Sequence, residues 1–248
     1  IIQDKLFYFV NAEVSRRTDP VLFAAGTSEV LLTAPIATQI RDSIVSFASR
    51  SGVANYDAGT IGAYSNSANS EKYLVRFDWN IGKSVVTLRN NFVNASAQNL
   101  ERGQLLNKLA SQDFTHFSQT NGTVVEVKTQ VSDNISNNFL AGLTQVRDHR
   151  TPYGTVTAPQ IEIQDIQYGQ INAGSDREAT VYKQHTNTIE LTNNLTWTLN
   201  HHTITAGTHN EFYNIEYTFL NSYNGRWQYP NIAAFLKGQP NRIRATIG

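Results

Sequence analysis

The sequence predicts an all-β protein, an antiparallel transmembrane β-barrel, and the strongest of three supporting observations is a long hairpin at residues 180–219. In its first arm apolar side chains alternate with threonine, asparagine and glutamate, as at Ile189, Leu191, Leu195 and Trp197. The second arm alternates in the same way after a turn at residues 199–202. Ordinary strands have about 5–6 residues. A tilted membrane strand needs about 9–11, with an apolar outer face and a polar inner face.

The second observation is the sorting of connections by length. The turns at residues 82–83, 132–137 and 199–202 are short, whereas residues 16–69, 96–119 and 221–239 lack strand periodicity and predict long loops. Outer-membrane barrels have short turns on the periplasmic side and long loops outside the cell.

The third observation is composition. The mean hydropathy is negative, and no run approaches the roughly 18 apolar residues of a helical span. Barrel strands direct only half of their side chains toward lipid, so a low hydropathy is compatible with a membrane location. The net charge of zero gives no basic surplus for nucleic acid, and the absence of cysteine removes disulfides and thiolate metal sites.

Taken in order, the predicted strands alternate clearly in residues 71–81 and 123–131, and less strictly elsewhere. Seven spans are predicted: the two arms of the hairpin, the two strands just named, and residues 5–15, 84–95 and 138–147. There would be eight if residues 160–167 also cross the membrane. We expect residues 160–167 to form an edge extension above the membrane instead. Residues 242–248 would open a further strand.

Within the first long loop, Thr33, Ala34 and Pro35 predict the start of a short helix, because proline near the first turn loses no hydrogen bond. Its apolar stripe would consist of Ile36, Ile40, Ile44 and Phe47.

Seven or eight spans with so long a first loop do not predict a closed small barrel. An open set of strands would leave unpaired backbone groups in lipid. We therefore expect the whole chain, residues 1–248, to be one part of a larger barrel domain. Its first and last spans would lie at unpaired edges, and the remaining strands would lie in sequence outside this chain. The lack of methionine, a signal peptide and a sorting tail fits an interior piece of a longer polypeptide.

The candidate functional residues are charged side chains on the predicted inner face, where they would contact a plug or line a translocation path. They are Lys72, Arg76, Arg89, Glu126, Lys128, Glu190 and Glu211. The plainer interpretation is that inner positions of a barrel wall are simply polar. Phe7 and Phe9 also face inward and require a packing partner. Trp79 and Trp197 lie near short turns, where interfacial aromatic residues are expected.

Other chemistry is less well supported. His201, His202 and His209 lack the spacing of a zinc site, and neither a cofactor nor a metal is expected. The acid pairs Glu211 with Glu216 and Glu126 with Asp133 lack a nucleophile and an orienting group, so no enzymatic activity is expected. A group of aromatic residues near an outer loop could stack on a ligand or anchor the interface; it comprises Tyr213, Tyr217, Tyr223, Trp227 and Tyr229.

Several strands resemble one known family. Residues 1–13, 75–80, 87–92 and 187–229 are similar to strands of Oar-like TonB-dependent receptors of the Bacteroidota. The resemblance implies a barrel of about 22 strands closed by an internal plug. It also implies energised uptake of a bulky nutrient and a TonB-type partner acting on the plug from the periplasm.

The chain departs from the full pattern of that family because it contains no plug, TonB box, amino-terminal carboxypeptidase-regulatory-like domain or final aromatic strand. No coupling or substrate residues can be carried over. The expected partners are therefore membrane lipid, an unidentified nutrient and, through a plug outside this chain, the energising protein. The alternatives are a non-enzymatic adhesin or structural barrel that binds a partner through its long loops, and an outer-membrane hydrolase.

Overall fold

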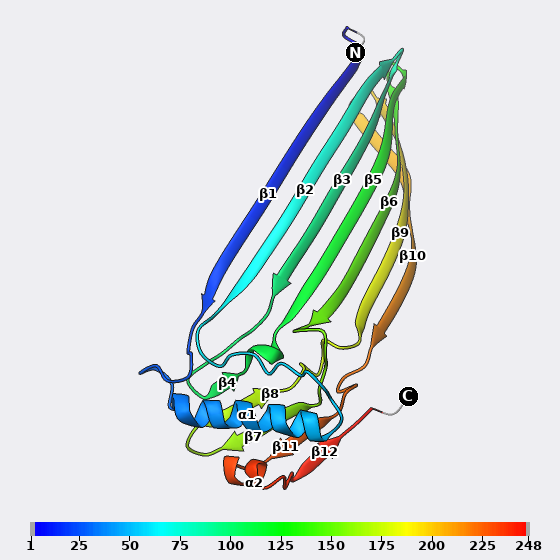
Figure 1. Ribbon diagram of the computed structural model, residues 1–248. Helices are drawn as coiled ribbons and strands as arrows, with labels where there is room; N and C mark the ends of the chain where they lie inside the picture. Colours follow the sequence, from blue (N-terminus) through cyan, green and yellow to red (C-terminus); the bar gives the residue numbers. More distant parts are fainter. Residues whose placement is uncertain (1–2, 247–248) are drawn as a thin grey trace.

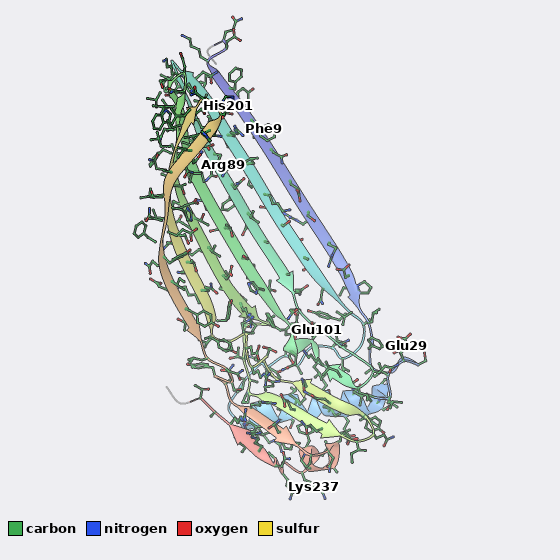
Figure 2. All side chains as sticks on the ribbon, turned by 180° about the vertical axis from the view of Figure 1, so that it is seen from behind. Phe9, Glu29, Arg89, Glu101, His201 and Lys237 are labelled. Atoms are coloured by element: carbon green, nitrogen blue, oxygen red, sulfur yellow. The ribbon has the colours of Figure 1, made fainter. Side chains whose placement is uncertain are left out.

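The computed structural model describes residues 3–246, which form two parts (Figure 1). Seven long antiparallel strands lie side by side in one curved sheet, which we call the wall. A smaller part with a second sheet and two helices lies beyond one end of these strands, and we call it the cap. Figure 2 labels Phe9 and Arg89 in the wall, His201 at its turn end, and Lys237 in the cap.

The wall has the order β1-β2-β3-β5-β6-β9-β10, and all of its neighbouring strands are antiparallel. Its strands are β1 (Leu6–Val21), β2 (Tyr64–Ile81), β3 (Ser84–Gln98), β5 (Phe114–Ser132), β6 (Ile135–Pro152), β9 (Tyr182–Leu199) and β10 (His202–Phe219). The three predicted short turns are confirmed. Gly82, with a φ of 57°, permits the tight β2–β3 turn because glycine adopts positive φ without strain.

The wall strands extend beyond their predicted ends at the cap side. The structure adds residues 16–21 to β1 and residues 64–70 to β2, which the sequence pattern assigned to a loop. These extensions are rich in serine, asparagine and charged residues, yet their backbone pairing continues without interruption. Period-2 apolar alternation requires one face in lipid, so it disappears where both faces of a strand meet water although the ladder of hydrogen bonds persists.

Strands β1 and β10 are the edges of the wall. Among residues 3–246, neither has a second neighbouring strand in this sheet. The prediction that the first and last spans end without partners is therefore confirmed. The wall is an open, curved sheet in Figure 1, with β1 and β10 at opposite edges.

The cap is built from three connections between wall strands, residues 22–63, 99–113 and 153–181, and from residues 220–246, which follow β10. Its sheet has the order β12-β11-β7-β8-β4, with parallel pairs β11–β7 and β4–β8. The elements are α1 (Ala34–Arg50), β4 (Leu106–Lys108), the 3-10 helix η1 (Ala110–Gln112), β7 (Gln160–Asp165), β8 (Gly169–Ala173), β11 (Arg226–Tyr229), α2 (Ile232–Leu236) and β12 (Arg242–Arg244). No helix in the described part of the chain is long and apolar enough to cross a membrane.

The hydrophobic core of the protein lies in the cap. Helix α1 buries Ala37, Ile40, Ile44 and Ala48 on one side, against β7, β8 and β11. The predicted apolar stripe is confirmed for Ile40 and Ile44, while Ile36 and Phe47 are partly buried beside them. Thr33 is the N-cap residue, as predicted, but its side chain makes no capping hydrogen bond.

Several loop predictions were wrong because the connections fold together. Residues 16–69, 96–119 and 221–239 contribute helices and short strands to the cap, so they are not unstructured loops. Residues 160–167 do not extend the wall, since β7 lies inside the second sheet. Residues 242–244 form β12 of that sheet and do not open a further wall strand. Residues 247 and 248, which end this predicted strand, lie outside the described residues. Residues 1 and 2, which begin the first segment that resembles the receptor family, also lie outside them.

A buried carboxylate joins the cap to the wall. Asp113, which is 2% exposed, precedes β5 and accepts hydrogen bonds from the Tyr64 hydroxyl of β2 at 2.7 Å and from the Asn99 backbone N–H at 2.9 Å. Its backbone carbonyl accepts from the Tyr153 N–H at 3.0 Å, next to the end of β6. A single residue therefore ties together the outer ends of β2, β3, β5 and β6.

The packing of α1 generates a prediction about the stability of the cap. Replacing Ile44 with alanine should destabilise the cap by about 2–5 kcal/mol, because Ile44 is 1% exposed and its loss leaves a cavity. Limited proteolysis should show faster cleavage in the cap, with the wall strands intact. Val45→Ala on the exposed side of α1 is the control, and equal protease resistance of the two variants would contradict the assigned core.

Tyr56 generates a prediction about alkaline pH. Burial raises the pKa of Tyr56 from 10.0 to about 12. The folded cap therefore favours the protonated phenol. Its contribution to stability is complete below pH 10 and is lost as the pH rises toward 12, by up to about 2–3 kcal/mol. Hydrogen exchange of cap amides should show this loss, and Tyr56→Phe should weaken it while leaving stability at neutral pH close to that of the wild type. An unchanged pH profile in this variant would contradict the assignment.

Candidate functional site: the charged face of the wall

The two faces of the wall differ in chemistry, and the register of the strands assigns each side chain to one of them. Residues that are paired across strands share a face. Following the pairs from β2 to β10 places all seven charged candidates on one face, which we call the charged face. They are Lys72, Arg76, Arg89, Glu126, Lys128, Glu190 and Glu211. That this face lines a lumen remains a prediction.

In one row of this face the charges are separated by sign. Across the sheet this row reads Arg76, Arg89, Val124, Gly142, Glu190 and Glu211 from β2 to β10. The basic end lies on β2 and β3, and the acidic end lies on β9 and β10. Val124 and Gly142, on the two strands between them, are uncharged in this row. Elsewhere on the charged face, Glu13, Asp78 and Glu126 form ion pairs with neighbouring basic side chains, so the segregation is a property of this row.

At the basic end, Arg76 forms a two-pronged ion pair with Asp78 on its own strand. The Nε and Nη2 groups donate to the two carboxylate oxygens at 2.8 and 2.9 Å. Thr87 of β3 donates its hydroxyl to Asp78 at 2.6 Å and is 7% exposed. Arg89 lies directly opposite Arg76 and has no carboxylate within ion-pair distance among residues 3–246. This basic side chain is available to an anionic group on a partner or solute.

At the acidic end, one histidine lies between two glutamates. His209 Nδ1 is 3.6 Å from Glu190 and its Nε2 is 3.4 Å from Glu211. The Thr192 hydroxyl is 2.7 Å from the same Nδ1, and the Tyr213 hydroxyl donates to Glu211. Glu190 and Glu211 are direct cross-strand partners, a placement that costs energy unless a cation lies nearby.

A cluster of aromatic rings lies on the same face near the cap. The Arg150 guanidinium is 4.1 Å from the ring centre of Tyr182 and 5.0 Å from that of Phe114. Tyr182 also packs edge-on against Tyr217 and Phe219. The sequence analysis missed Arg150 and Tyr182, although each falls at an inward position when the alternation of its strand is continued toward the cap.

The aromatic group predicted near an outer loop is not one cluster. Tyr213 and Tyr217 lie on the charged face of β10, whereas Tyr229 is buried in the cap core and Trp227 packs against Phe47 with ring centres 4.9 Å apart. Tyr223 is exposed in the cap.

The other candidate groups are also separated. His201 and His202 lie at the β9–β10 turn, away from His209. Glu216 projects from the opposite face of β10 to Glu211. Asp133 lies in the β5–β6 turn, outside the strand that carries Glu126.

The opposite face of the wall, which we call the apolar face, carries both predicted interfacial tryptophans. Trp79 pairs with Leu6 and Val86, and Trp197 pairs with Ile135 and Ile204, each near a short turn. Nearer the cap, Tyr73 and Phe92 stack with ring centres 6.3 Å apart. On β9 the apolar-face side chains are exposed from residue 189 to 197, within the length that a tilted membrane strand needs.

Comparison with known proteins agrees with this geometry. A family model described as "Outer membrane beta barrel domain" matches residues 32–247, most of the chain. Neither the curated proteins nor the solved structures contain a significant match.

The two faces generate a prediction that depends on the register alone. Val75 lies on the apolar face and Arg76 on the charged face of β2. Val75→Arg should destabilise the wall by about 2–4 kcal/mol in a bilayer, whereas Arg76→Gln should have a small effect on folding. Spin labels at the two positions should report lipid contact at residue 75 and water or protein contact at residue 76. The reverse accessibility would mean a register error of one residue.

Proposed function

Because the chain belongs to the outer membrane beta barrel domain family, we propose that it forms part of the wall of a transporter that takes up a bulky nutrient across the cell outer membrane. The observation that carries the proposal is the charged face of an open sheet. A wall of seven strands with two unpaired edges requires further strands, because unpaired backbone groups are costly in lipid. The resulting barrel would be wide enough to contain a plug.

The arrangement of the charged face supports an inward orientation. On β9 the side chains of this face are half-buried, while those of the apolar face are exposed from Ile189 to Trp197. Basic and acidic side chains distributed over the same face suit a surface that binds a folded plug in one orientation and releases it when the plug is pulled. Such a surface binds through many modest ion pairs instead of one buried contact.

The energy source in this proposal is a TonB-type protein that acts on the plug. The support is the resemblance of the wall strands to Oar-like receptors of the Bacteroidota, together with Phe7 and Phe9. These two rings lie on the charged face of β1 and are 50% and 53% exposed. Apolar rings on an otherwise polar inner face require cover from another part of the protein. The proposed role is binding and passage of a solute, without catalysis.

A second candidate function, adhesion to a partner, is favoured by the cap. Its four contributing segments share one hydrophobic core, so its outer surface is rigid without a ligand. Preformed surfaces lose little conformational entropy on binding. A transporter could use the same rigidity to hold the outer ends of its wall strands, so the cap is compatible with both functions.

The experiment that tests the transport proposal uses the full-length protein in cells, with a photo-crosslinking amino acid at position 9. Illumination should join position 9 to a plug segment of the same polypeptide, since Phe9 faces inward. The same crosslinker at position 8 is the matched control, because Tyr8 lies on the apolar face and should react with lipid.

The crosslink should weaken when the cells are energised in the presence of the TonB-type protein, since the plug would then move. Lipid adducts at both positions would contradict the transport proposal and leave the adhesin as the better explanation.

A further inference from the structure

We propose that the wall carries a binding site for the phosphate groups of an outer-leaflet glycolipid, formed by two cationic side chains and two histidines on β6 and β9. The residues are Arg147, His149, Lys183 and His185. The site is independent of what the protein transports. It depends on the outer-membrane location and on the long connections facing outward from the cell.

The four side chains form a compact block. Arg147 pairs directly with His185, and His149 pairs with Lys183, so two adjacent cross-strand pairs lie next to each other on neighbouring strands. The alternation of both strands places all four on the apolar face. They therefore project from the outer surface of the wall, which meets lipid, and not from the charged face.

The block lies just above the headgroup layer, close enough for its long side chains to reach the phosphates. The apolar band ends toward the cap at Leu143 on β6 and at Ile189 on β9, which are paired. Arg147 and His185 lie four residues further along, about 13 Å along the strand at about 3.3 Å per residue. A strand tilt of about 40° reduces this to about 10 Å of height. The polar layer of one leaflet is about 5–7 Å thick, so long basic side chains that reach back toward the membrane meet its phosphates.

The block has little internal charge compensation. Among the described residues its nearest carboxylate is Glu216, 3.9 Å from His185 and 74% exposed. Asp148, between Arg147 and His149 in sequence, projects from the opposite face. Arg147 donates from Nη2 to Asn187 at 2.7 Å and from Nη1 to the carbonyls of Val146 and Thr186 at 2.8 and 3.2 Å. These bonds orient the guanidinium and leave the Nε–H and one Nη2 hydrogen for a ligand.

Aromatic packing also fixes one of the histidines. His149 stacks on Phe117 of β5 with ring centres 4.8 Å apart and an angle of 8° between the rings. An ordered imidazole next to a guanidinium and an ammonium group suits a phosphate monoester, which accepts several charge-assisted hydrogen bonds.

The rest of the wall at this height is not basic. The same row of the apolar face holds Glu71 on β2, Asn94 on β3 and Gln119 on β5. Arg16, one row further toward the cap, is neutralised by an ion pair with Glu71. The positive charge is therefore confined to β6 and β9. A membrane whose outer leaflet carries phosphorylated glycolipid supplies a matching anion at that level.

The test measures binding of bisphosphorylated lipid A, the phosphate-bearing anchor of lipopolysaccharide, to the full-length protein in detergent by native mass spectrometry. The double variant Arg147→Gln with Lys183→Gln should bind lipid A about thirtyfold more weakly, as expected for two charges near a membrane surface. The double variant Arg16→Gln with Arg17→Gln removes the same charge elsewhere on β1 and should retain wild-type affinity.

Two further measurements make the outcome decisive. Dephosphorylated lipid A should bind to the wild type as weakly as the intact lipid binds to the Arg147/Lys183 variant, and inorganic phosphate at equal concentration should not displace the lipid. The heat-modifiable gel mobility of a folded barrel confirms that each variant is folded. The proposal is overturned by equal affinities of the two double variants, by tight binding of dephosphorylated lipid, or by displacement with inorganic phosphate.

Discussion

The pairing of backbone groups within the bilayer is the constraint on which the rest of the structure depends. Hydrocarbon offers no water to an unpaired N–H or carbonyl, so each strand must be bonded to a neighbour wherever it crosses. The uninterrupted ladders from β1 to β10 meet this requirement inside the wall. They also fix the register, and the register decides which side chains meet lipid and which meet the interior. The separation of Val75 from Arg76 and the row from Arg76 to Glu211 are consequences of this one constraint.

The structure divides its stabilising interactions between two places. The wall is held by backbone hydrogen bonds and has few buried side chains, whereas the cap has a conventional hydrophobic core around Ile40, Ile44 and Ile163. Asp113 connects the two, because it bonds to groups at the outer ends of several strands and is itself buried. The separation allows the inner and outer faces of the wall to keep charged residues that a packed core would exclude.

The sequence predicted the part of the fold that repeats. Alternation in residues 71–81 and 189–197 identified the strands and their two faces, and it placed Trp79 and Trp197 on the apolar face near short turns, because an apolar environment on one face forces a period of two. The same reasoning failed where that force is absent. The cap strands have three to six residues, too few for a pattern, and β11 pairs in parallel with β7 far away in the chain. Arg150 and Tyr182 were missed because they lie where the strands have already left the apolar band.

The shared core of the cap has a consequence for biogenesis. Tyr229 and Phe235 come from the segment after β10 and share one core with residues of the first connection, such as Ile40, so the core cannot be complete until the chain beyond β10 is in place. If the long connections face outward, as in other outer-membrane barrels, the cap residues would cross the periplasm and the membrane as unfolded chain, with the apolar side of α1 uncovered. A periplasmic chaperone that binds unfolded segments would prevent these apolar side chains from aggregating before insertion. The cap would then fold last, outside the cell. Once folded, it would be too bulky to pass back through the membrane, so the wall strands could not slide back toward the periplasm.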